Sequence, residues 1–322
     1  MTPPFKLTLR MLTLASQIER RVGRAEGLEL QAPQPLLRKR SRVRTIAGST
    51  AIEGNTLTEE QVTALLEGKR VIGDRREVLE VTNANAAYDA APGYVAHRQR
   101  DLLAAHRVLM KGLVERAGRF RTGNVGVMQG SKVAHVAPPP RLVKGQVEEL
   151  LGWVRDAEVP LLIRSCVAHY ELLFIHPFID GNGRLARLWQ HVALLQASPV
   201  YRFVPIESVI RERQKQYYAV LRKSDRAGDC TAFVEYVLEA LRDALDETLA
   251  ALRPTRPRPD DRLELAREHF GTRWFTRGDY LQLHRTIGTA TASRDLLDAA
   301  EERVLEKRGE RRFTRYRFAR SS

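Results

Sequence analysis

Apolar side chains recur every three or four positions along most of the first 252 residues, the spacing that places them on one face of an α-helix. One helix is expected from Ser41 to Glu53. The next begins after Thr58, whose hydroxyl can form a capping box with Gln61, and ends at Gly68. Further helices are expected over residues 78–91, 98–116, 142–157, 160–175, 184–197, 207–226 and 230–252. The pattern therefore predicts a mainly α fold.

Two regions break this helical pattern. The β-prone stretches Val125–Met128 and Lys132–Val136 flank Gln129-Gly130-Ser131, which predicts a small hairpin. Alternating prolines over residues 253–260 predict a linker. Helices are then expected at 261–270, 276–284 and 291–307, followed by a basic strand pair that includes residues 311–318. This order resembles a winged helix-turn-helix domain.

The run from His176 to Arg187, HPFIDGNGRLAR, carries the main chemical signal. Gly181 and Gly183 allow the backbone around Asn182 to turn its N–H groups inward, which creates a concavity suited to phosphate oxygens. A helical apolar pattern follows directly. The concavity therefore lies at a helix N-terminus, where the helix dipole also favours anions.

Charged side chains complete this candidate site. Arg184 and Arg187 lie one helical turn apart and can bind successive phosphates. Asp180 offers the hard oxygen ligand that Mg²⁺ prefers. His176 precedes the concavity and can act as a general base toward an incoming hydroxyl group.

This run matches the signature of the Fic family, His-Pro-Phe-x-Asp/Glu-Gly-Asn-Gly-Arg-x-x-Arg, at every defined position. The resemblance implies a nucleotidyltransferase that moves AMP from ATP to a Ser, Thr or Tyr hydroxyl of a target protein. It also implies that His176 is the base and that Asp180 binds Mg²⁺, with Mn²⁺ as the alternative ion. The implied nucleotide-binding residues are Asn182 with the flanking backbone of Gly181 and Gly183 at the α-phosphate, Arg184 at the β-phosphate and Arg187 at the γ-phosphate.

The segment STAIEGN, from Ser49 to Asn55, resembles the inhibitory motif of the same family, Ser/Thr-x-x-x-Glu-Gly/Asn. The resemblance implies that Glu53 pairs with Arg187. A carboxylate there would compete for the guanidinium that the γ-phosphate needs, so ATP would bind with its phosphates misplaced. The alternative is an ordinary glutamate at a helix end capped by Gly54. In related enzymes the same glutamate is thought to orient a water that removes AMP, and the sequence does not separate these two activities.

The predicted hairpin resembles the Fic flap, which docks a target segment by adding its backbone to the hairpin edge. The residues expected to dock the target are Val125, Gly126, Val127, Met128, Lys132 and Val133. Tyr217, Tyr218 and Leu221 are candidates for a wall beside the nucleotide base. His169 and His191 fall inside helices, so we interpret them as packed residues rather than ligands.

The overall composition narrows the class of protein. With 43% hydrophobic and 29% charged residues, the 322-residue chain fits a globular protein. No apolar run reaches the ~18–20 residues that span a bilayer, and the first residues do not resemble a secretory signal. We therefore expect a cytoplasmic protein without membrane contact. Two cysteines make a disulfide framework or a zinc site implausible.

Together these signals predict four parts of the chain. They are an N-terminal helical region with the inhibitory helix at residues 1–95, a Fic catalytic core at 96–252, the linker at 253–260 and a winged-helix-like domain at 261–322. A homodimer is compatible with this organisation, and the target protein is not readable.

The role of the last domain has two interpretations. The net charge of +14 is compatible with nucleic-acid contact, with acidic partners or simply with an arginine-rich proteome. The third helix of this domain would read DNA, but four acidic residues in it would repel a DNA backbone, namely Asp295, Asp298, Glu301 and Glu302. We therefore favour protein docking over DNA binding. A DNA-binding regulator with a nucleotide-sensing core, and an enzyme that transfers another nucleotide, remain as alternatives.

Overall fold

The computed structural model describes residues 3–31, 35–129, 132–156, 158–252, 258–310 and 313–319. The chain divides into two compact units, Met1–Glu26 with Arg40–Ala251 and Gly27–Lys39 with Leu252–Ser322. The finer division expected at residues 95 and 96 stays a prediction. Most of the predicted linker, residues 253–257, lies outside the described residues.

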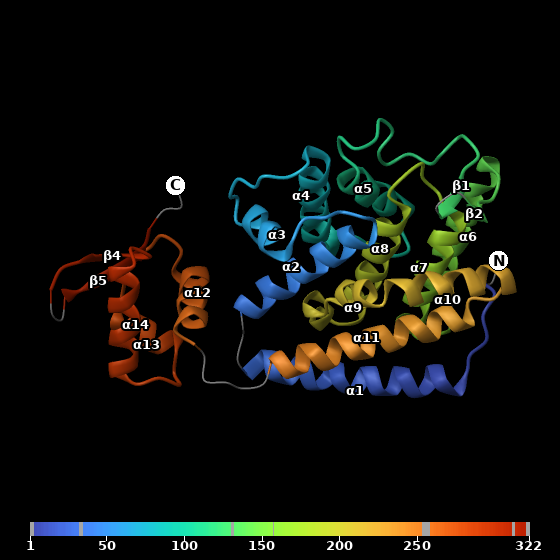
Figure 1. Cartoon of the computed structure of the whole chain (residues 1–322). Coiled ribbons are helices and arrows are strands. Elements are labelled where there is room, and N and C mark those ends of the chain that lie inside the picture. The colour runs from blue at the N-terminus through green and yellow to red at the C-terminus, as the bar shows by residue number, and fades with distance from the viewer. Residues whose placement is uncertain are drawn as a thin grey trace. The chain divides into compact units, whose positions relative to one another are not determined.

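The described chain up to residue 251 is almost entirely helical, as the hydrophobic pattern predicted (Figure 1). Its helices are α1 (Leu9–Gln31), α2 (Pro35–Ile52), α3 (Glu59–Leu66), α4 (Arg75–Ala90), α5 (Gln99–Leu109), α6 (Pro140–Asp156), α7 (Leu161–Ile175), α8 (Asn182–Ala197), α9 (Ile206–Glu212), α10 (Gln214–Ala227) and α11 (Thr231–Ala251), with 3₁₀ turns η1 (Ala91–Gly93) and η2 (Pro199–Phe203).

Two expected helices end earlier than the hydrophobic pattern suggested. The helix expected to reach residue 116 stops at Leu109, and Gly112 and Gly118 beyond it adopt positive φ angles. The helix expected over 207–226 is divided at Arg213, whose ψ of 26° leaves the helical range. The Arg213 guanidinium there pairs with Asp243 of α11 at 2.8 Å. The first boundary thus coincides with glycine turns and the second with a tertiary ion pair, and helical periodicity encodes neither.

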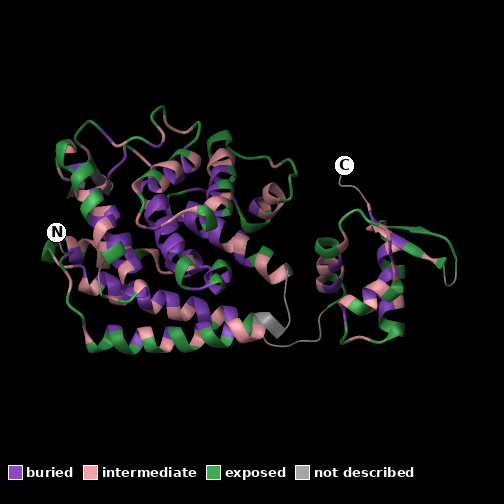
Figure 2. Cartoon of the chain, turned by 180° about the vertical axis from the view of Figure 1, so that it is seen from behind, coloured by how far each residue is buried: buried purple, intermediate pink, exposed green. Residues whose placement is uncertain are grey.

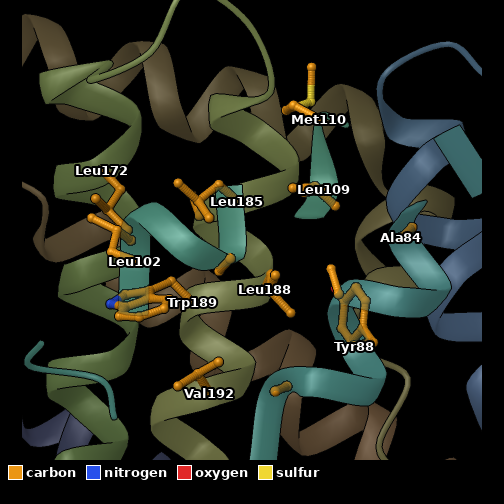
Figure 3. Packing of buried hydrophobic residues seen from close by; sticks show 14 of the residues in the cluster. Ala84, Tyr88, Leu102, Leu109, Met110, Leu172, Leu185, Leu188, Trp189 and Val192 are labelled. Carbon is orange, nitrogen blue, oxygen red and sulfur yellow. The ribbon is translucent and has the colours of Figure 1, made fainter. Parts of the chain in front are cut away.

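Helix α8 is buried along most of its length and lies at the centre of the first unit (Figures 1 and 2). Apolar side chains of α8 such as Leu185 and Leu188 pack with Leu102 of α5 and Leu172 of α7 (Figure 3). The indole N–H of Trp189 donates to the carbonyl of Ala96 at 2.9 Å. Because α8 is surrounded by close-packed neighbours, its N-terminus is a fixed point in the fold.

Helix α1 lies along α11 (Figure 1). The apolar side chains of Met11 and Ile18 on α1 are fully buried. On the outer edge, Arg21 forms a bidentate pair with Asp246 at 2.7 and 2.9 Å. Since the ion pair is partly exposed, most of the stabilisation comes from the apolar contacts.

Helix α2 approaches α9 closely at Gly48. A Cβ on Gly48 would lie 2.7 Å from the backbone carbonyl carbon of Glu207 and 2.8 Å from the nitrogen of Ser208. The Ser208 hydroxyl also donates to the carbonyl of Arg44 at 3.2 Å. Backbone therefore packs directly on backbone, and only glycine fits at this crossing.

Two histidines inside the helices are packed residues, as predicted. His169 bonds to Gln190 Oε1 through Nδ1 at 2.8 Å and to the Tyr217 hydroxyl through Nε2 at 3.1 Å. Burial lowers the pKa of His169 to about 3, and that of His191 to about 3 as well. Both rings are therefore neutral in the folded protein at ordinary pH.

The hairpin expected between residues 125 and 136 is present. Strands β1 (Gly126–Gln129) and β2 (Lys132–Val136) pair in antiparallel register, with Gly126 opposite Val136. A register shift lies between Val127 and Met128.

The second unit contains α12 (Pro259–Phe270), β3 (Phe275–Thr276), α13 (Arg277–Leu283), α14 (Thr289–Glu301), β4 (Leu305–Arg308) and β5 (Arg315–Phe318). Its sheet has the order β3-β5-β4 and is antiparallel. The helix expected to reach residue 307 ends at Glu301, because the chain turns at Arg303, which has a φ of 60°. Residues 305–308 form a strand instead, and residues 311 and 312 lie outside the described part.

The acidic face expected on α14 is smaller than the sequence suggested. Asp295 is buried and pairs bidentately with Arg262 of α12, at 2.6 Å to Nε and 2.7 Å to Nη2. The Tyr280 hydroxyl donates to the same carboxylate at 3.1 Å. Its charge therefore stabilises the interior of the unit, and only Asp298 and Glu301 of the expected acidic set lie exposed within α14 itself.

Stability should fall in acid because of the buried histidines. Each has a folded-state pKa below its unfolded value of about 6.5, so below that pH the unfolded chain binds protons that the folded chain does not. We expect the free energy of unfolding to fall between pH 6.5 and about 4, by up to about 1.4 kcal/mol per pH unit for each histidine. Urea unfolding across this range measures it. In His169→Gln the slope should be shallower, and an unchanged slope would contradict the assignment.

Enlarging Gly48 should weaken the packing of α2 on α9. Gly48→Ala is expected to destabilise the protein by about 1–3 kcal/mol, the usual cost of overpacking. Gly23→Ala is the matched control, because Gly23 lies in α1 and an added methyl group would meet no atom within 4 Å. There the substitution should stabilise by about 0.5–1 kcal/mol. Chemical denaturation of both variants tests this, and equal effects would be inconsistent with a close approach at Gly48.

Candidate active site

The loop between α7 and α8 contains the residues that the sequence singled out. Helix α7 ends at Ile175 and is capped by His176, which adopts a left-handed conformation with φ 50° and ψ 60°. Gly181 precedes α8 with φ 83°, and a Cβ there would lie 2.5 Å from Met110 Sδ. The backbone conformation therefore favours glycine before α8, and any larger residue would also have to displace the Met110 side chain. The first N–H groups of α8 point out of this helix end, as in an anion site.

The Asn182 side chain braces this loop. Its Oδ1 accepts from the backbone N–H of Phe178 at 2.9 Å, and its Nδ2 donates to the carbonyl of the same residue at 2.8 Å. Since the amide is engaged in this pair of hydrogen bonds, the backbone N–H is the group of Asn182 that remains suited to an anion.

A histidine outside the signature supports the same loop. The ring of His106 stacks on Phe178, with centroids 3.7 Å apart. The N–H of Gly118 donates to His106 Nδ1 at 2.8 Å, so the other ring nitrogen carries the proton and donates to the carbonyl of Asp180 at 3.0 Å. Burial lowers the pKa of His106 to about 4. This neutral ring fixes the peptide between Asp180 and Gly181.

His176 is oriented through its ring nitrogen Nδ1. That atom lies 3.3 Å from the carbonyl oxygen of Leu173. A carbonyl oxygen only accepts, so this contact favours the tautomer with the proton on Nδ1. Nε2 then keeps its lone pair, as a general base requires.

Glu53 reaches the loop from the end of α2. The helix ends at Ile52, and Gly54 follows Glu53 with a φ of 99°. The Ile52 carbonyl accepts from Gln214 Nε2 at 2.8 Å and from the Tyr218 hydroxyl at 3.3 Å. These contacts from α10 fix the point from which the Glu53 side chain extends. The base-wall interpretation does not suit Tyr217, which is buried against His169.

The carboxylate of Glu53 pairs with the buried guanidinium of Arg187. Oε1 of Glu53 lies 2.8 Å from Arg187 Nη2. The same Nη2 donates to the carbonyl of Ser49 at 2.8 Å, and Nε donates to the Ser49 hydroxyl at 3.2 Å. Burial lowers the pKa of Arg187, but the charge and hydrogen bond of Glu53 together with the nearby Tyr217 and Tyr88 outweigh it, so the pKa is raised.

Glu53 also lies against the first turn of α8. A Cβ on Gly183 would be 2.3 Å from Glu53 Oε1. The carboxylate therefore stands over the helix N-terminus, and its oxygen occupies a position suited to a phosphate oxygen. Glu53 thus lies at a helix end followed by Gly54 and also contacts Arg187, as the resemblance implied, while its inhibitory role stays a prediction.

Arg184 is also engaged by acidic groups. Its Nη1 lies 3.2 Å from Glu80 Oε1 of α4, and its Nη2 lies 3.4 Å from Asp180 Oδ1. Its Nε and Nη1 are nevertheless buried without a partner of hydrogen-bond geometry. Buried guanidinium donors in this state can accommodate a further anion. Arg76 of α4 lies 3.3 Å from Asp180 Oδ2.

The position of Asp180 suits a carboxylate that would hold Mg²⁺ together with the phosphates of a bound substrate. Its side chain is 41% exposed at the edge of the anion site. Among the described residues, no group of three or more His, Cys, Asp or Glu side chains could hold a metal alone. Mg²⁺ usually binds one or two carboxylates together with substrate phosphates and water, which this arrangement allows.

The hairpin lies in the chain between Arg121 and Pro138. Arg121 contacts both Pro138 and the active-site loop. Arg121 is buried and donates to the carbonyls of His176 at 2.7 Å and Pro138 at 2.5 Å. The side chains of the expected docking residues Val127, Met128, Lys132 and Val133 lie outside the described part of the structure.

Four side chains at the site had not been assigned a role from the sequence, namely Arg76, Glu80, His106 and Arg121. Each lies at least 50 residues before the signature and acts through a tertiary contact. Nothing in their local sequence distinguishes them from other charged or polar residues on helices and loops. Only the fold brings them to the loop.

Removing the Glu53 carboxylate should open the anion site to other anions. We expect Glu53→Gly to lower the melting temperature without ligand, because the buried Arg187 loses its counter-charge, at a cost of up to about 3 kcal/mol. Inorganic tripolyphosphate should then raise the melting temperature more in this variant than in the wild type. Thermal unfolding with and without tripolyphosphate measures both effects.

The matched control for that measurement is Glu158→Gly, which removes an exposed carboxylate from a bend. It should respond to tripolyphosphate as the wild type does. Equal stabilisation of all three proteins by tripolyphosphate would contradict the competition between Glu53 and a phosphate.

No described helix is both long and apolar enough to span a membrane. The model of the Fic/DOC family matches residues 97–194, which include the whole loop and most of α8. The chain is 31% identical over 217 residues to the protein adenylyltransferase fic-1 of Caenorhabditis elegans, over 64% of this chain and 41% of that protein. It is 30% identical over 214 residues to the protein adenylyltransferase Fic of Nematostella vectensis, over 63% and 48%. It thus spans less than half the length of these two relatives.

Solved structures show a match over a longer part of the chain. The crystal structure of a Fic family protein from Desulfovibrio desulfuricans G20 is 39% identical and superposes with a TM-score of 0.76, covering 100% of this chain and 99% of that one. Residues 134–508 of C. elegans Fic-1 are 25% identical with a TM-score of 0.58, covering 75% and 74%. Taken with the complete signature between α7 and α8, the full-length match shows that this chain belongs to the Fic family.

Proposed function

We propose that this protein is an adenylyltransferase, which transfers AMP from ATP to a Ser, Thr or Tyr hydroxyl of a target protein and is inhibited by its own Glu53. The observation that supports this most is the carboxylate of Glu53 over the N-terminus of α8, paired with Arg187. An anion already occupies the position that the signature assigns to phosphate. The names of the relatives, protein adenylyltransferase, favour AMP as the transferred group.

The reaction uses groups that the loop holds in place. Nε2 of His176 accepts the proton of the target hydroxyl, and the hydroxyl oxygen forms a bond to the α-phosphorus of ATP. The bond from that phosphorus to the α,β-bridging oxygen breaks, so that pyrophosphate leaves with the electron pair. Arg184 and Arg187 hold the β- and γ-phosphates and stabilise the leaving charge. His176 then releases its proton to solvent.

Mg²⁺, or Mn²⁺ in its place, supplies charge neutralisation at the phosphates when it is bound. Asp180 is the residue that would hold it. Arg76 and Arg184 both lie within 3.4 Å of this carboxylate. In this proposal both arginines shift toward the phosphates when nucleotide binds.

Inhibition follows from competition for one guanidinium. While Oε1 of Glu53 remains on Arg187, a γ-phosphate has no place on that side chain, and ATP is misaligned for in-line attack. A carboxylate at the same place can also orient a water toward an AMP-modified hydroxyl. We therefore propose AMP removal as a second activity of the wild-type site, which keeps Glu53, and test it together with AMP transfer.

Target recognition is assigned to the hairpin. The edge of β1 and β2 can pair with the backbone of an extended target segment, which holds a hydroxyl near His176 without selecting a particular side chain. For the C-terminal unit we propose docking to a protein, in a winged-helix-like arrangement. Its exposed α14 residues include the apolar Leu297 at 42% exposure, which suits a protein surface better than a phosphate backbone.

Intact mass after incubation with Mg-ATP tests the proposal. Fic enzymes without inhibition often modify themselves, so no target is needed. We expect an AMP adduct on Glu53→Gly, formed about 10²-fold faster than on the wild type, and none on Glu53→Gly/His176→Ala. Glu158→Gly serves as the control for loss of an exposed carboxylate and should behave as the wild type.

Other outcomes of this experiment are informative. If a different nucleoside triphosphate gave an adduct and ATP gave none, the transferred group would be that nucleotide and not AMP. Equal labelling of the wild type and Glu53→Gly would contradict the inhibitory role. Loss of the adduct when modified Glu53→Gly protein, freed of ATP, is mixed with wild type would demonstrate AMP removal. No adduct on any variant, with specific binding of the protein to DNA, would favour the regulator.

A further inference from the structure

The guanidinium of Arg121 binds four backbone carbonyl groups from three separate segments. Nε donates to His176 O at 2.7 Å, and Nη1 donates to Gly123 O at 3.0 Å. Nη2 donates to Pro138 O at 2.5 Å and to Ile175 O at 3.3 Å. In the described part of the chain, its hydrogen-bond partners are all backbone carbonyls. The side chain therefore connects the end of α7 to both ends of the hairpin segment.

The main chain of Arg121 adds a fifth connection. Its N–H donates to the carbonyl of Pro177 at 3.0 Å. The residue as a whole is only 4% exposed. Its positive charge lies at the C-terminus of α7, where the free carbonyls of a helix carry partial negative charge. The helix end and the arginine thus compensate each other's charge, and no acidic side chain among the described residues pairs with Arg121.

The conformation of His176 makes this contact important. A left-handed φ of 50° is unfavourable for a residue with a Cβ. The neighbouring structure has to hold it, and Arg121 binds the carbonyls immediately before and at this residue. The same guanidinium sets the plane of the His176–Pro177 peptide, and so the direction in which the imidazole leaves the backbone.

We propose that Arg121 is a positioning residue, which fixes the base His176 and the target-docking hairpin relative to each other. The hairpin would hold the target backbone, and Arg121 would keep the hydroxyl at a constant offset from Nε2. This inference rests on the proposed function for its kinetic consequence, but not for its structural one. Within the described chain, the carbonyls that Arg121 binds include none of the groups that would hold the phosphates.

The choice of variants follows from the geometry. Arg121→Lys keeps a charge at the end of α7, but a single ammonium cannot reproduce the planar fork that reaches four carbonyls. Arg121→Ala removes the side chain and leaves space for free guanidinium. Arg119→Ala is the matched control, because Arg119 is an exposed arginine two residues away. All three are made in the Glu53→Gly background.

We expect Arg121→Lys and Arg121→Ala to lower the turnover number for self-modification about 10²-fold, as small misplacements of reacting groups do. The dissociation constant of a non-hydrolysable ATP analogue, measured by calorimetry, should change less than threefold. Millimolar guanidinium should restore part of the rate of Arg121→Ala and have no effect on Arg119→Ala. A rate unchanged in Arg121→Ala, or a loss of nucleotide affinity as large as the loss of rate, would overturn the proposal.

A second measurement does not depend on activity. Amide hydrogen exchange of the nucleotide-free Arg121→Lys protein should increase in residues 123–138 and 173–178 together, and remain unchanged in α11. Exchange that rises throughout the first unit would mean general destabilisation and would overturn the proposal, as would exchange unchanged in both segments. If the Glu53→Gly parent shows no transfer, the proposed function fails, and the exchange result still decides the role of Arg121.

Discussion

The N-terminus of α8 favours a negatively charged group beside it, and the arrangement of the site depends on which group binds there. The helix is buried along most of its length, so this end of it cannot move toward an incoming anion. Its dipole, the first-turn N–H groups and Arg187 all favour negative charge at one place. In the free protein Glu53 supplies that charge. Helix α2 is therefore part of the site, although it lies some 130 residues earlier in the chain.

Within the loop, side chains stabilise the backbone conformation and backbone N–H groups face the anion site. Asn182, His106 and Phe178 brace the peptide by hydrogen bonds and stacking. Their polar atoms are used inside the protein, which leaves backbone N–H groups to face an anion. A loop built in this way holds its shape before any ligand arrives. Because the loop is already ordered, an anion that binds at this helix end meets little further ordering cost.

The local parts of this organisation were predictable from the sequence. The residues of the signature are contiguous, and their spacing fixes which of them share a helix turn. Thr58 and Gln61 form the capping box that their spacing predicted. Contacts between distant segments were not predictable in this way. Arg121 and Glu80 acquire their partners only when α4, α7 and α8 pack, and Asp295 was expected on a surface because its partner Arg262 is on another helix. The helix ends at Leu109 and Glu301 are followed by turns, which the spacing of hydrophobic residues does not predict.

The short connection between Ile52 and Glu53 has a thermodynamic consequence. The carbonyl of Ile52 is held by Gln214 and Tyr218, so the carboxylate one residue later is an intramolecular ligand with a high effective concentration at Arg187. Dilution of the protein does not weaken such a ligand. Any anion from free solution competes for Arg187 against that high effective concentration. Movement of the α2 end relative to α10 changes this effective concentration, so the pairing of Glu53 with Arg187 depends on a distance within the fold.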